Sequence, residues 1–297
     1  MGAAGFLIIG HRGARGLYPE NTLEGVARAW AAGVRYFEID IGATADGVPV
    51  LYHDLVLNPN ITRGPDGAWL ARPGPAISAL TLAELAQFDV GRIRPGTRYA
   101  ARYPRQVPAD GARIPTLEAV LHAAPEAGFT VELKTDPTRP DLTVSGPKMA
   151  ERVVAVAEAA RAAERIRVQS FDWRGPRHLG RVRPDIARAW LTEPKTVAAA
   201  PLWWGVERRG ESVAQAVAAE AGPAGDALVW APEHRSFDQT ELAEARALGL
   251  AVIPWTVNEA NEMVRLKEWG AAGLITDRPD LAVALDRAGG RGGEASA

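Results

Sequence analysis

Two acidic side chains in one short apolar segment are the first residues of the chain that could do chemistry. Glu38 and Asp40 lie two positions apart in the run 36–41, whose apolar residues predict a buried strand. Side chains two positions apart in a strand point to the same face, so these carboxylates would repel each other unless a cation lies between them. A hard divalent cation with oxygen ligands is the simplest candidate.

A third carboxylate, Glu132, lies in a later apolar segment, two positions before Lys134. The chain has no cysteine and hence no thiolate ligands, so carboxylates on neighbouring strands would favour Ca²⁺ or Mg²⁺ over zinc. The alternative is that the acids form ion pairs with Arg12 and Lys134 and hold no metal. Buried charges are costly unless they are paired or bound to a ligand, and both hypotheses meet that condition.

Two histidines and an arginine lie near these acids in the sequence. His11 and Arg12 directly follow the apolar segment 6–9, and His53 follows the acidic strand by a short connection. An imidazole titrates near neutral pH and can serve as general acid or general base. A guanidinium can donate two parallel hydrogen bonds to an oxyanion, although Arg12 could instead form only a salt bridge to Glu38.

The order of these motifs resembles that of the glycerophosphodiester phosphodiesterases, barrel enzymes related to the phosphatidylinositol-specific phospholipases C. The similarity extends over roughly residues 6–285. The motifs are HRG at 11–13, PENT at 19–22, E-x-D at 38–40, T-x-DG at 44–47, HD at 53–54, VELK at 131–134, QSFD at 169–172, PWTVN at 254–258 and ITD at 275–277. The resemblance implies an α/β fold, a (β/α)8 TIM barrel, with the active site at the carboxyl ends of its strands.

The resemblance also implies catalytic roles. It makes Glu38, Asp40 and Glu132 the ligands of a divalent metal, Ca²⁺ or Mg²⁺. It makes His11 and His53 the catalytic pair, which would exchange the acid and base roles. In related enzymes a hydroxyl next to the phosphoester attacks phosphorus, and the cyclic phosphate that forms is then hydrolysed. Such an internal nucleophile gains an advantage from its proximity.

Three side chains are expected to contact the substrate. Arg12 and Lys134 would stabilise negative charge on the phosphoryl oxygens, and Lys134 could also hold a ligand carboxylate in place. Trp255 matches the family's aromatic residue at the pocket wall, although it could be an ordinary core tryptophan. Several of the nine tryptophans fall near strand ends, which suggests the hypothesis of a cation–π site for a choline headgroup.

The function that the resemblance implies is hydrolysis of glycerophosphodiesters, which are deacylated phospholipids, to an alcohol and sn-glycerol 3-phosphate. One alternative keeps the chemistry but takes lipids: a lysophospholipase D with Trp203 and Trp204 as an apolar lip. A second is a non-catalytic phosphate-binding barrel, although no motif histidine or acid is missing. A phospholipase C-type reaction would instead leave the phosphate on the headgroup.

The elements that must position these residues follow a β-α rhythm, which is typical of a parallel sheet. Eight apolar segments predict strands at 6–9, 36–41, 129–133, 166–170, 186–191, 228–230, 251–257 and 273–275. Helices are predicted at 22–32, 117–124, 148–163, 213–221, 238–248 and 259–269. Several strands end in polar motif residues, which agrees with an active site at that end of a barrel.

The segment after the second strand departs from this rhythm. Asp46 and Gly47 lie between two β-rich runs and predict a hairpin. Its return arm, 48–53, would bring His53 back to the level of Asp40. The alternative is a separate barrel strand with a short connection.

Residues 1–286 are expected to form a single domain. Within it, residues 54–115 lack the β-α rhythm and are predicted to form a small insertion at the barrel mouth. The tail 287–297 is rich in Gly and Ala and is predicted to be disordered.

Composition limits the kinds of partner. Of the 297 residues, 47% are hydrophobic and 24% are charged, and the net charge of −2 gives no field that favours nucleic acid or an anionic membrane. No apolar run approaches the ~18 residues of a spanning helix, and the N-terminus has no basic region of a signal peptide. We therefore expect a cytoplasmic protein with a small-molecule substrate, no nucleic-acid partner and no stable membrane insertion.

Overall fold

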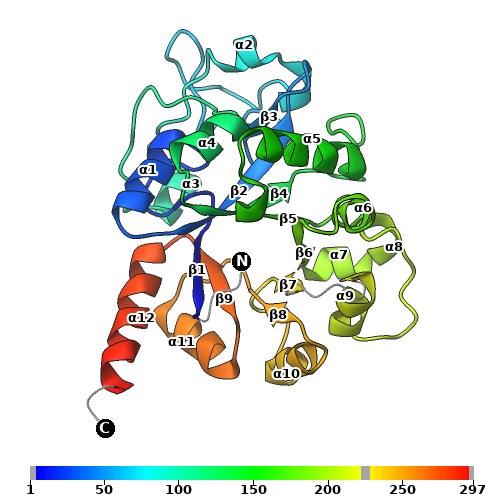
Figure 1. The fold of residues 1–297 in the computed structure, drawn as a ribbon. Coiled ribbons are helices and arrows are strands. Elements are labelled where there is room, and N and C mark those ends of the chain that lie inside the picture. The colour runs from blue at the N-terminus through cyan, green and yellow to red at the C-terminus, as the bar shows by residue number, and fades with distance from the viewer. Residues whose placement is uncertain (1–4, 222–227, 294–297) are drawn as a thin grey trace.

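The computed structural model describes residues 5–221 and 228–293 of the chain. Within them, eight parallel strands lie in the order β8-β7-β6-β5-β4-β2-β1-β9 and curve into a barrel (Figure 1). The strands are β1 (Leu7–Gly10), β2 (Tyr36–Ala43), β4 (Gly128–Leu133), β5 (Ile166–Ser170), β6 (Ala187–Thr192), β7 (Val229–Pro232), β8 (Ala251–Val252) and β9 (Gly273–Thr276). The predicted (β/α)8 fold is confirmed.

Backbone hydrogen bonds between the last two strands close the ring. β8 is regular only over Ala251–Val252, and Pro254, which has no N–H, interrupts the ladder beyond it. The chain nevertheless stays beside β9, since Ala272 N donates to Val252 O at 2.9 Å and Ile275 N donates to Pro254 O at 2.9 Å. The predicted strand 251–257 is therefore an irregular member of the barrel.

The segment after β2 turns back on it, as the hairpin motif predicts. β3 (Pro49–Leu51) pairs antiparallel with the end of β2 and lies outside the ring, so the alternative of a separate barrel strand is wrong. Gly47 at the turn has a φ of 88°, which glycine adopts without steric cost. Tyr52 N donates to Asp40 O at 3.0 Å, and this bond places the next residue, His53, at the level of the acidic pair.

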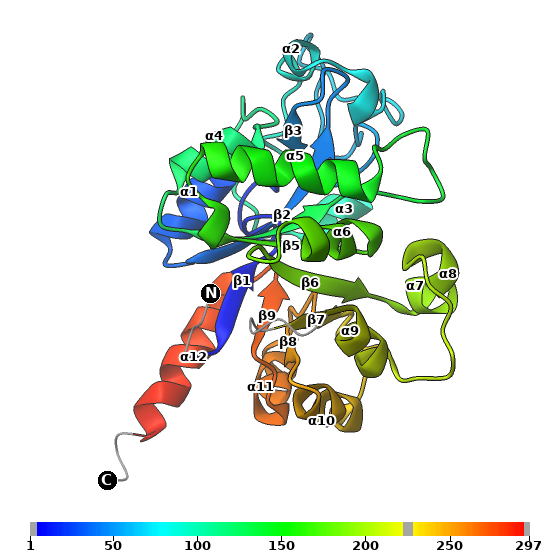
Figure 2. The same cartoon turned by 45° about the vertical axis from the view of Figure 1, so that its right-hand side comes forward.

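Helices cover the outside of the barrel (Figure 2). Those near predicted positions are α1 (Leu23–Ala31), α4 (Leu117–Ala123), α5 (Gly146–Ala159), α9 (Val213–Ala221), α10 (Gln239–Ala247) and α11 (Ala260–Trp269). Four further helices were not predicted: α6 (Arg174–Val182), α7 (Pro194–Ala198), α8 (Ala200–Trp203) and α12 (Pro279–Gly293). Gly175, Pro176 and Gly180 lower the intrinsic helix propensity of α6, which therefore depends on packing of its buried Leu179.

Helix α12 overlaps the tail 287–297 that the sequence predicts to be disordered. It continues past Arg287, where the sequence predicts disorder to begin. Residues 294–297 of that predicted tail lie outside the described residues. Among the described helices, none combines the length and the apolar character needed to cross a membrane.

Residues 54–115 form a layer beyond the ends of β2 and β3 (Figure 1). Their short helices are η1 (Ile77–Ala79), a 3₁₀-helix, α2 (Leu82–Leu85) and α3 (Arg98–Arg102). Buried apolar side chains of this layer, among them Leu57 and Leu85, form a cluster of their own. Val50 and Tyr52 of the hairpin belong to the same cluster, so the layer is packed continuously onto the barrel.

The interior of the barrel contains an apolar plug. It consists of residues from several strands that meet inside the ring: Ile9, Ala189, Val229, Ile253 and Ile275. The larger apolar clusters lie between the sheet and its helices. The charged motif residues lie at the carboxyl ends of the strands, where a barrel of this kind has its active site.

Candidate active site

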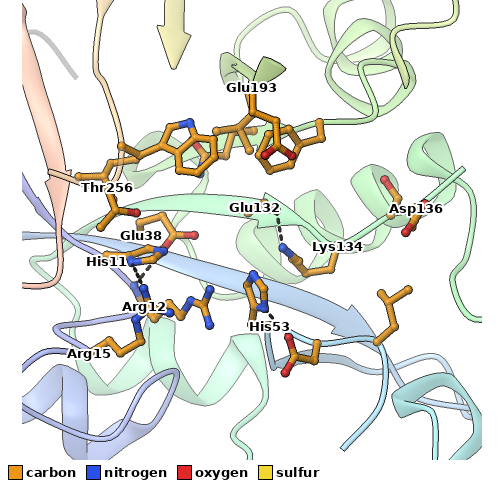
Figure 3. Close-up of a pocket in the computed structure, with 18 of the residues that line it drawn as sticks. His11, Arg12, Arg15, Glu38, His53, Glu132, Lys134, Asp136, Glu193 and Thr256 are labelled. Atoms are coloured by element: carbon orange, nitrogen blue, oxygen red, sulfur yellow. Dashed lines mark hydrogen bonds and ion pairs between the residues drawn. The ribbon is translucent and has the colours of Figure 1, made fainter. Parts of the chain in front are cut away.

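A cavity of about 430 Å³ opens at the carboxyl ends of the strands (Figure 3). Most of the predicted site residues line it: His11, Arg12, Glu38, His53, Glu132, Lys134 and Trp255. Asp40 is fully buried and lies beside this lining, with Oδ1 3.5 Å from Lys134 Nζ. The fold therefore brings together the predicted metal ligands, the two histidines, Arg12, Lys134 and Trp255.

Glu38, Asp40 and Glu132 form a compact group of carboxylates. Each offers one oxygen, and these oxygens lie within 4.8 Å of one another. The register explains the group, because Asp40 on β2 is directly opposite Glu132 on β4 and Glu38 points to the same face as Asp40.

Two oxygens of this group, Glu38 Oε1 and Asp40 Oδ1, are buried without a hydrogen-bond partner among the described residues. Burial, followed by the repulsion of the neighbouring carboxylates, raises the pKa of Glu38 well above its ordinary value. Carboxylate oxygens that repel one another and lack hydrogen bonds are stabilised by a cation, and an all-oxygen donor set fits Ca²⁺ or Mg²⁺. The residues present therefore fit the predicted metal.

The cationic side chains beside the group neutralise it only in part. Lys134 Nζ lies 2.6 Å from Glu132 Oε1, and Arg12 Nε lies 3.4 Å from Asp40 Oδ2. Glu38 has no lysine or arginine side chain as an ion-pair partner within the described ranges, and it accepts a hydrogen bond from Arg12 backbone N at 2.9 Å. The alternative in which Arg12 makes only a salt bridge to Glu38 is wrong, because its guanidinium faces Asp40.

Each candidate histidine has a carboxylate at its Nδ1 atom. His11 Nδ1 lies 2.6 Å from Asp277 Oδ1. His53 Nδ1 lies 2.7 Å from Asp54 Oδ1. The Nε2 atom of each ring is therefore left to take or give a proton. The Nε2 atom of His11 lies 3.8 Å from Glu38 Oε2.

The surroundings keep both histidines neutral. Burial, with the charge of Arg15 next, lowers the pKa of His11 to about 4. Burial and the charge of Arg12 act in the same direction on the pKa of His53. A neutral imidazole can accept a proton from a substrate hydroxyl, so the geometry and the charges both suit general base catalysis.

Several residues that orient these groups were not predicted from the sequence. Arg15 Nε donates to Asp277 Oδ1 at 3.0 Å, and Asn258 Nδ2 donates to Asp277 Oδ2 at 2.9 Å. Asn21 Nδ2 donates to Asp40 Oδ2 at 2.8 Å. Asp277 could have been found from its position, because it directly follows the last strand within the ITD motif.

Aromatic rings form one wall of the cavity. The ring of Phe171 is nearly perpendicular to that of Trp255, at 83° and 5.5 Å between centroids, and to that of Trp203, at 76° and 6.4 Å. Trp255 lines the cavity and donates from Nε1 to Ala231 O at 2.9 Å, so it is not an ordinary core tryptophan. Trp204 is fully buried, and only Trp203 of the proposed lip reaches the cavity.

The rim beside this wall carries charge. Glu193 lies across the cavity from His53 (Figure 3), and its Oε1 is 2.8 Å from Lys195 Nζ. Asp136 lies on the same rim beyond Lys134. The cavity thus has an inner charged zone at the strand ends and an outer zone of mixed aromatic and charged character.

Comparisons with known proteins identify the family of the chain. A family model described as the glycerophosphoryl diester phosphodiesterase family matches residues 11–281. The glycerophosphodiester phosphodiesterase of Bacillus subtilis (strain 168) is 26% identical over 278 residues, which cover 93% of this chain and 84% of that protein. A solved structure from Silicibacter pomeroyi that bears the family name is 34% identical, with a TM-score of 0.86, and the match covers 97% of this chain and 96% of that one.

A more distant structure shows the same fold. The Oleispira antarctica phosphodiesterase, solved with the product sn-glycerol-3-phosphate, has a TM-score of 0.70 at 23% identity, and the match covers 94% of this chain and 96% of that one. The resemblance predicted from the motifs is confirmed by the family model. The chain therefore belongs to the glycerophosphoryl diester phosphodiesterase family, whose members are phosphoric diester hydrolases.

Proposed function

We propose that the protein is a divalent-metal-dependent glycerophosphodiester phosphodiesterase that releases an alcohol and sn-glycerol 3-phosphate. One observation carries the proposal: buried carboxylate oxygens without hydrogen-bond partners lie at a cavity lined by two histidines, each of which has a carboxylate at its Nδ1 atom. A cation site next to two proton-transfer groups suits phosphodiester hydrolysis, because the cation can neutralise phosphoryl charge while the groups move the protons.

Glu38, Asp40 and Glu132 would hold the metal. When bound, Ca²⁺ or Mg²⁺ would neutralise negative charge that develops on a phosphoryl oxygen. Arg12 and Lys134, which border the same cavity, would bind the remaining phosphoryl oxygens as hydrogen-bond donors. Their contacts with the acids would also hold those carboxylates in place.

The histidines would move the protons. In the first step one imidazole takes the proton of the substrate hydroxyl next to the ester, that oxygen bonds to phosphorus, and the bond from phosphorus to the leaving oxygen breaks. The other imidazole, protonated in the complex, gives its proton to the leaving alkoxide. In the second step water opens the cyclic phosphate and His11 and His53 exchange these roles, which returns both to their starting state.

The aromatic wall supports a preference among headgroups. The ring of Phe171 is nearly perpendicular to those of Trp203 and Trp255, and Glu193 lines the same cavity. Rings and a carboxylate together favour a quaternary ammonium, which makes glycerophosphocholine the preferred small-molecule substrate. Equal turnover of glycerophosphoethanolamine would contradict this preference.

The lysophospholipase D alternative has less support, since Trp204 is buried and an apolar lip would rest on Trp203 with Leu202, which is 44% exposed. Detergent-dependent activity on lysophosphatidylcholine would favour it. A cytoplasmic location stays a prediction from the sequence.

A panel of glycerophosphodiesters tests the proposal. Each diester is incubated with purified protein, then with EDTA, then with Mg²⁺ or Ca²⁺ restored, and sn-glycerol 3-phosphate is measured enzymatically. We expect turnover that EDTA abolishes and metal restores. Phosphate retained on the headgroup would indicate a phospholipase C-type reaction, and no turnover of any diester would contradict the proposal.

A further inference from the structure

The insertion contacts the loop that carries the catalytic arginine. Helix α3 (Arg98–Arg102) and the residues after it lie against the segment between β1 and α1. Gln106 Nε2 donates to Arg15 O at 2.8 Å, and Val107 N donates to Leu17 O at 2.8 Å. The ring of Tyr103 lies under the guanidinium of Arg15, 4.7 Å from its centroid. These contacts tie the insertion to the catalytic loop itself.

A chain of polar side chains runs from α3 to the active site. The hydroxyl of Tyr99 donates to Glu20 Oε2 in a short hydrogen bond. The other oxygen of that carboxylate, Oε1, accepts from Arg12 Nη1 at 2.8 Å. Glu20 and Arg12 are both buried, with 6% and 8% of their surfaces exposed. Both oxygens of Glu20 are therefore occupied, one by the insertion and one by the arginine.

The position of the Arg12 guanidinium depends on Glu20, because Arg12 has an unusual backbone conformation and its side chain also contacts Asp40. Its φ is +51°, a region that non-glycine residues rarely adopt. Its Nε lies 3.4 Å from Asp40 Oδ2, so a rotated guanidinium would shift toward the metal-binding carboxylates. A carboxylate that is held at its other oxygen has little freedom to move, so it restricts the position of the guanidinium nitrogen that it binds.

We propose that Tyr99 is a positioning residue for the phosphodiesterase reaction, which acts through Glu20 to hold the guanidinium of Arg12 toward the substrate phosphate. The insertion thus completes the phosphate-binding site from behind. Burial, and next the charge of Glu20, raises the pKa of Tyr99 above its ordinary value, so its hydroxyl stays protonated and keeps donating. The inference rests on the proposed function, because Arg12 acts in that reaction.

A double-mutant cycle tests this role. Tyr99→Phe, Arg12→Lys and the double variant are compared with the wild type by kcat/KM for glycerophosphocholine. We expect Tyr99→Phe to lower kcat/KM about tenfold, the size expected for a buried hydrogen bond to a charged group. In the Arg12→Lys background the same change should alter kcat/KM less than about twofold, because the group that Tyr99 positions is already absent.

Tyr103→Phe is the matched control, since it keeps the ring over Arg15 and its hydroxyl makes no hydrogen bond among the described residues. It should change kcat/KM less than about twofold. Thermal unfolding of every variant separates lost stability from lost positioning. Equal tenfold losses in both backgrounds, or no loss on Tyr99→Phe, would overturn the inference. Absence of wild-type turnover on every diester would instead overturn the proposed function.

Discussion

At the scale of single residues, the two histidines each have a carboxylate at Nδ1, but the two carboxylates come from different parts of the chain. His53 takes its carboxylate from the adjacent residue, Asp54, so the pair is visible in the sequence. His11 takes its carboxylate from Asp277 at the opposite end of the chain. The second contact exists only because β9 closes the barrel against β1. The orientation of His11 therefore depends on the fold as a whole.

Asp277→Asn should reduce kcat about a hundredfold or more, because an amide no longer selects the ring tautomer with Nε2 free to accept a proton. Metal content should change little, whereas the thermal midpoint should fall, because the buried guanidinium of Arg15 loses its charged partner. Steady-state kinetics and metal analysis measure both. Asp280→Asn, an acid paired with Arg278 on the next helix, is the matched control and should keep wild-type activity. Wild-type activity of Asp277→Asn would show that His11 is oriented without this carboxylate.

The pH dependence of activity follows from the lowered pKa of His11. In the free enzyme this pKa is about 4, so the base is available well below pH 6.5. The acid limb of kcat/KM should therefore lie below pH 6.5. A bound anionic phosphate favours the imidazolium, so the acid limb of kcat should lie at higher pH. Profiles of both constants between pH 4 and 8 check this, and a kcat/KM limb at or above 6.5 would contradict it.

The lowered pKa of His11 also makes the free energy of unfolding depend on pH. Between pH 6.5 and 4 the unfolded chain binds a proton at His11 that the folded protein resists. The free energy of unfolding should therefore fall as the pH decreases through this window. Above pH 6.5 this histidine contributes no pH dependence.

At the scale of elements, neighbouring strands create the candidate metal site through their register. Asp40 faces Glu132 across the β2–β4 ladder, and a shift of either strand by one residue would turn its acids to the helix-covered face. The apolar residues Ile39 and Val131, which are fully buried, alternate with the acids and fix this register. The strands that carry the ligands are thus held in place by the hydrophobic core.

Glu38→Gln should show the repulsion that the metal relieves. The amide keeps an oxygen that can accept from the Arg12 backbone N–H. It removes the negative charge of the Glu38 carboxyl group, whose pKa is raised. Without metal, the variant should melt about 2–4 °C above the wild type, as about 1 kcal/mol would give. With Mg²⁺ or Ca²⁺ added, the wild type should gain more in melting temperature than the variant.

Differential scanning calorimetry in EDTA and in added metal measures both effects. Glu118→Gln, which changes an exposed acid on α4, controls for a general effect of charge. An equal metal-induced shift in the wild type and in Glu38→Gln would argue against Glu38 as a ligand.

At the scale of the whole molecule, the sequence predicted the barrel and the hairpin because these depend on local patterns, and it predicted candidate site residues that the fold brings around one cavity. Apolar runs mark the strands, and Asp46-Gly47 marks the turn that places His53. Asp277 could have been found as a candidate from its motif, but its contact with His11, and that of Tyr99 with Glu20, joins distant segments, and no local pattern records such contacts. Helix α6 was missed for another reason, since its glycines and proline oppose a helix that tertiary packing then stabilises.

The insertion and the barrel should unfold together, as a single domain would. Leu85 on α2 is fully buried in a cluster that also contains Val50 and Tyr52 of the hairpin. Leu85→Ala leaves a cavity there and should lower the free energy of unfolding by about 2–5 kcal/mol. Because the hairpin joins this cluster to β2, the loss should appear in one cooperative transition that fluorescence and circular dichroism report alike.

Urea titrations of the wild type and of Leu85→Ala, followed by both probes, measure this. Leu248→Ala, at a position 40% exposed on the barrel side, is the control and should cost far less. A separate early transition in Leu85→Ala, with activity lost in that step and barrel circular dichroism retained, would make the insertion an independent unit. A single transition would instead mean that the support of Arg12 by Tyr99 is as stable as the barrel, since α3 could not detach without global unfolding.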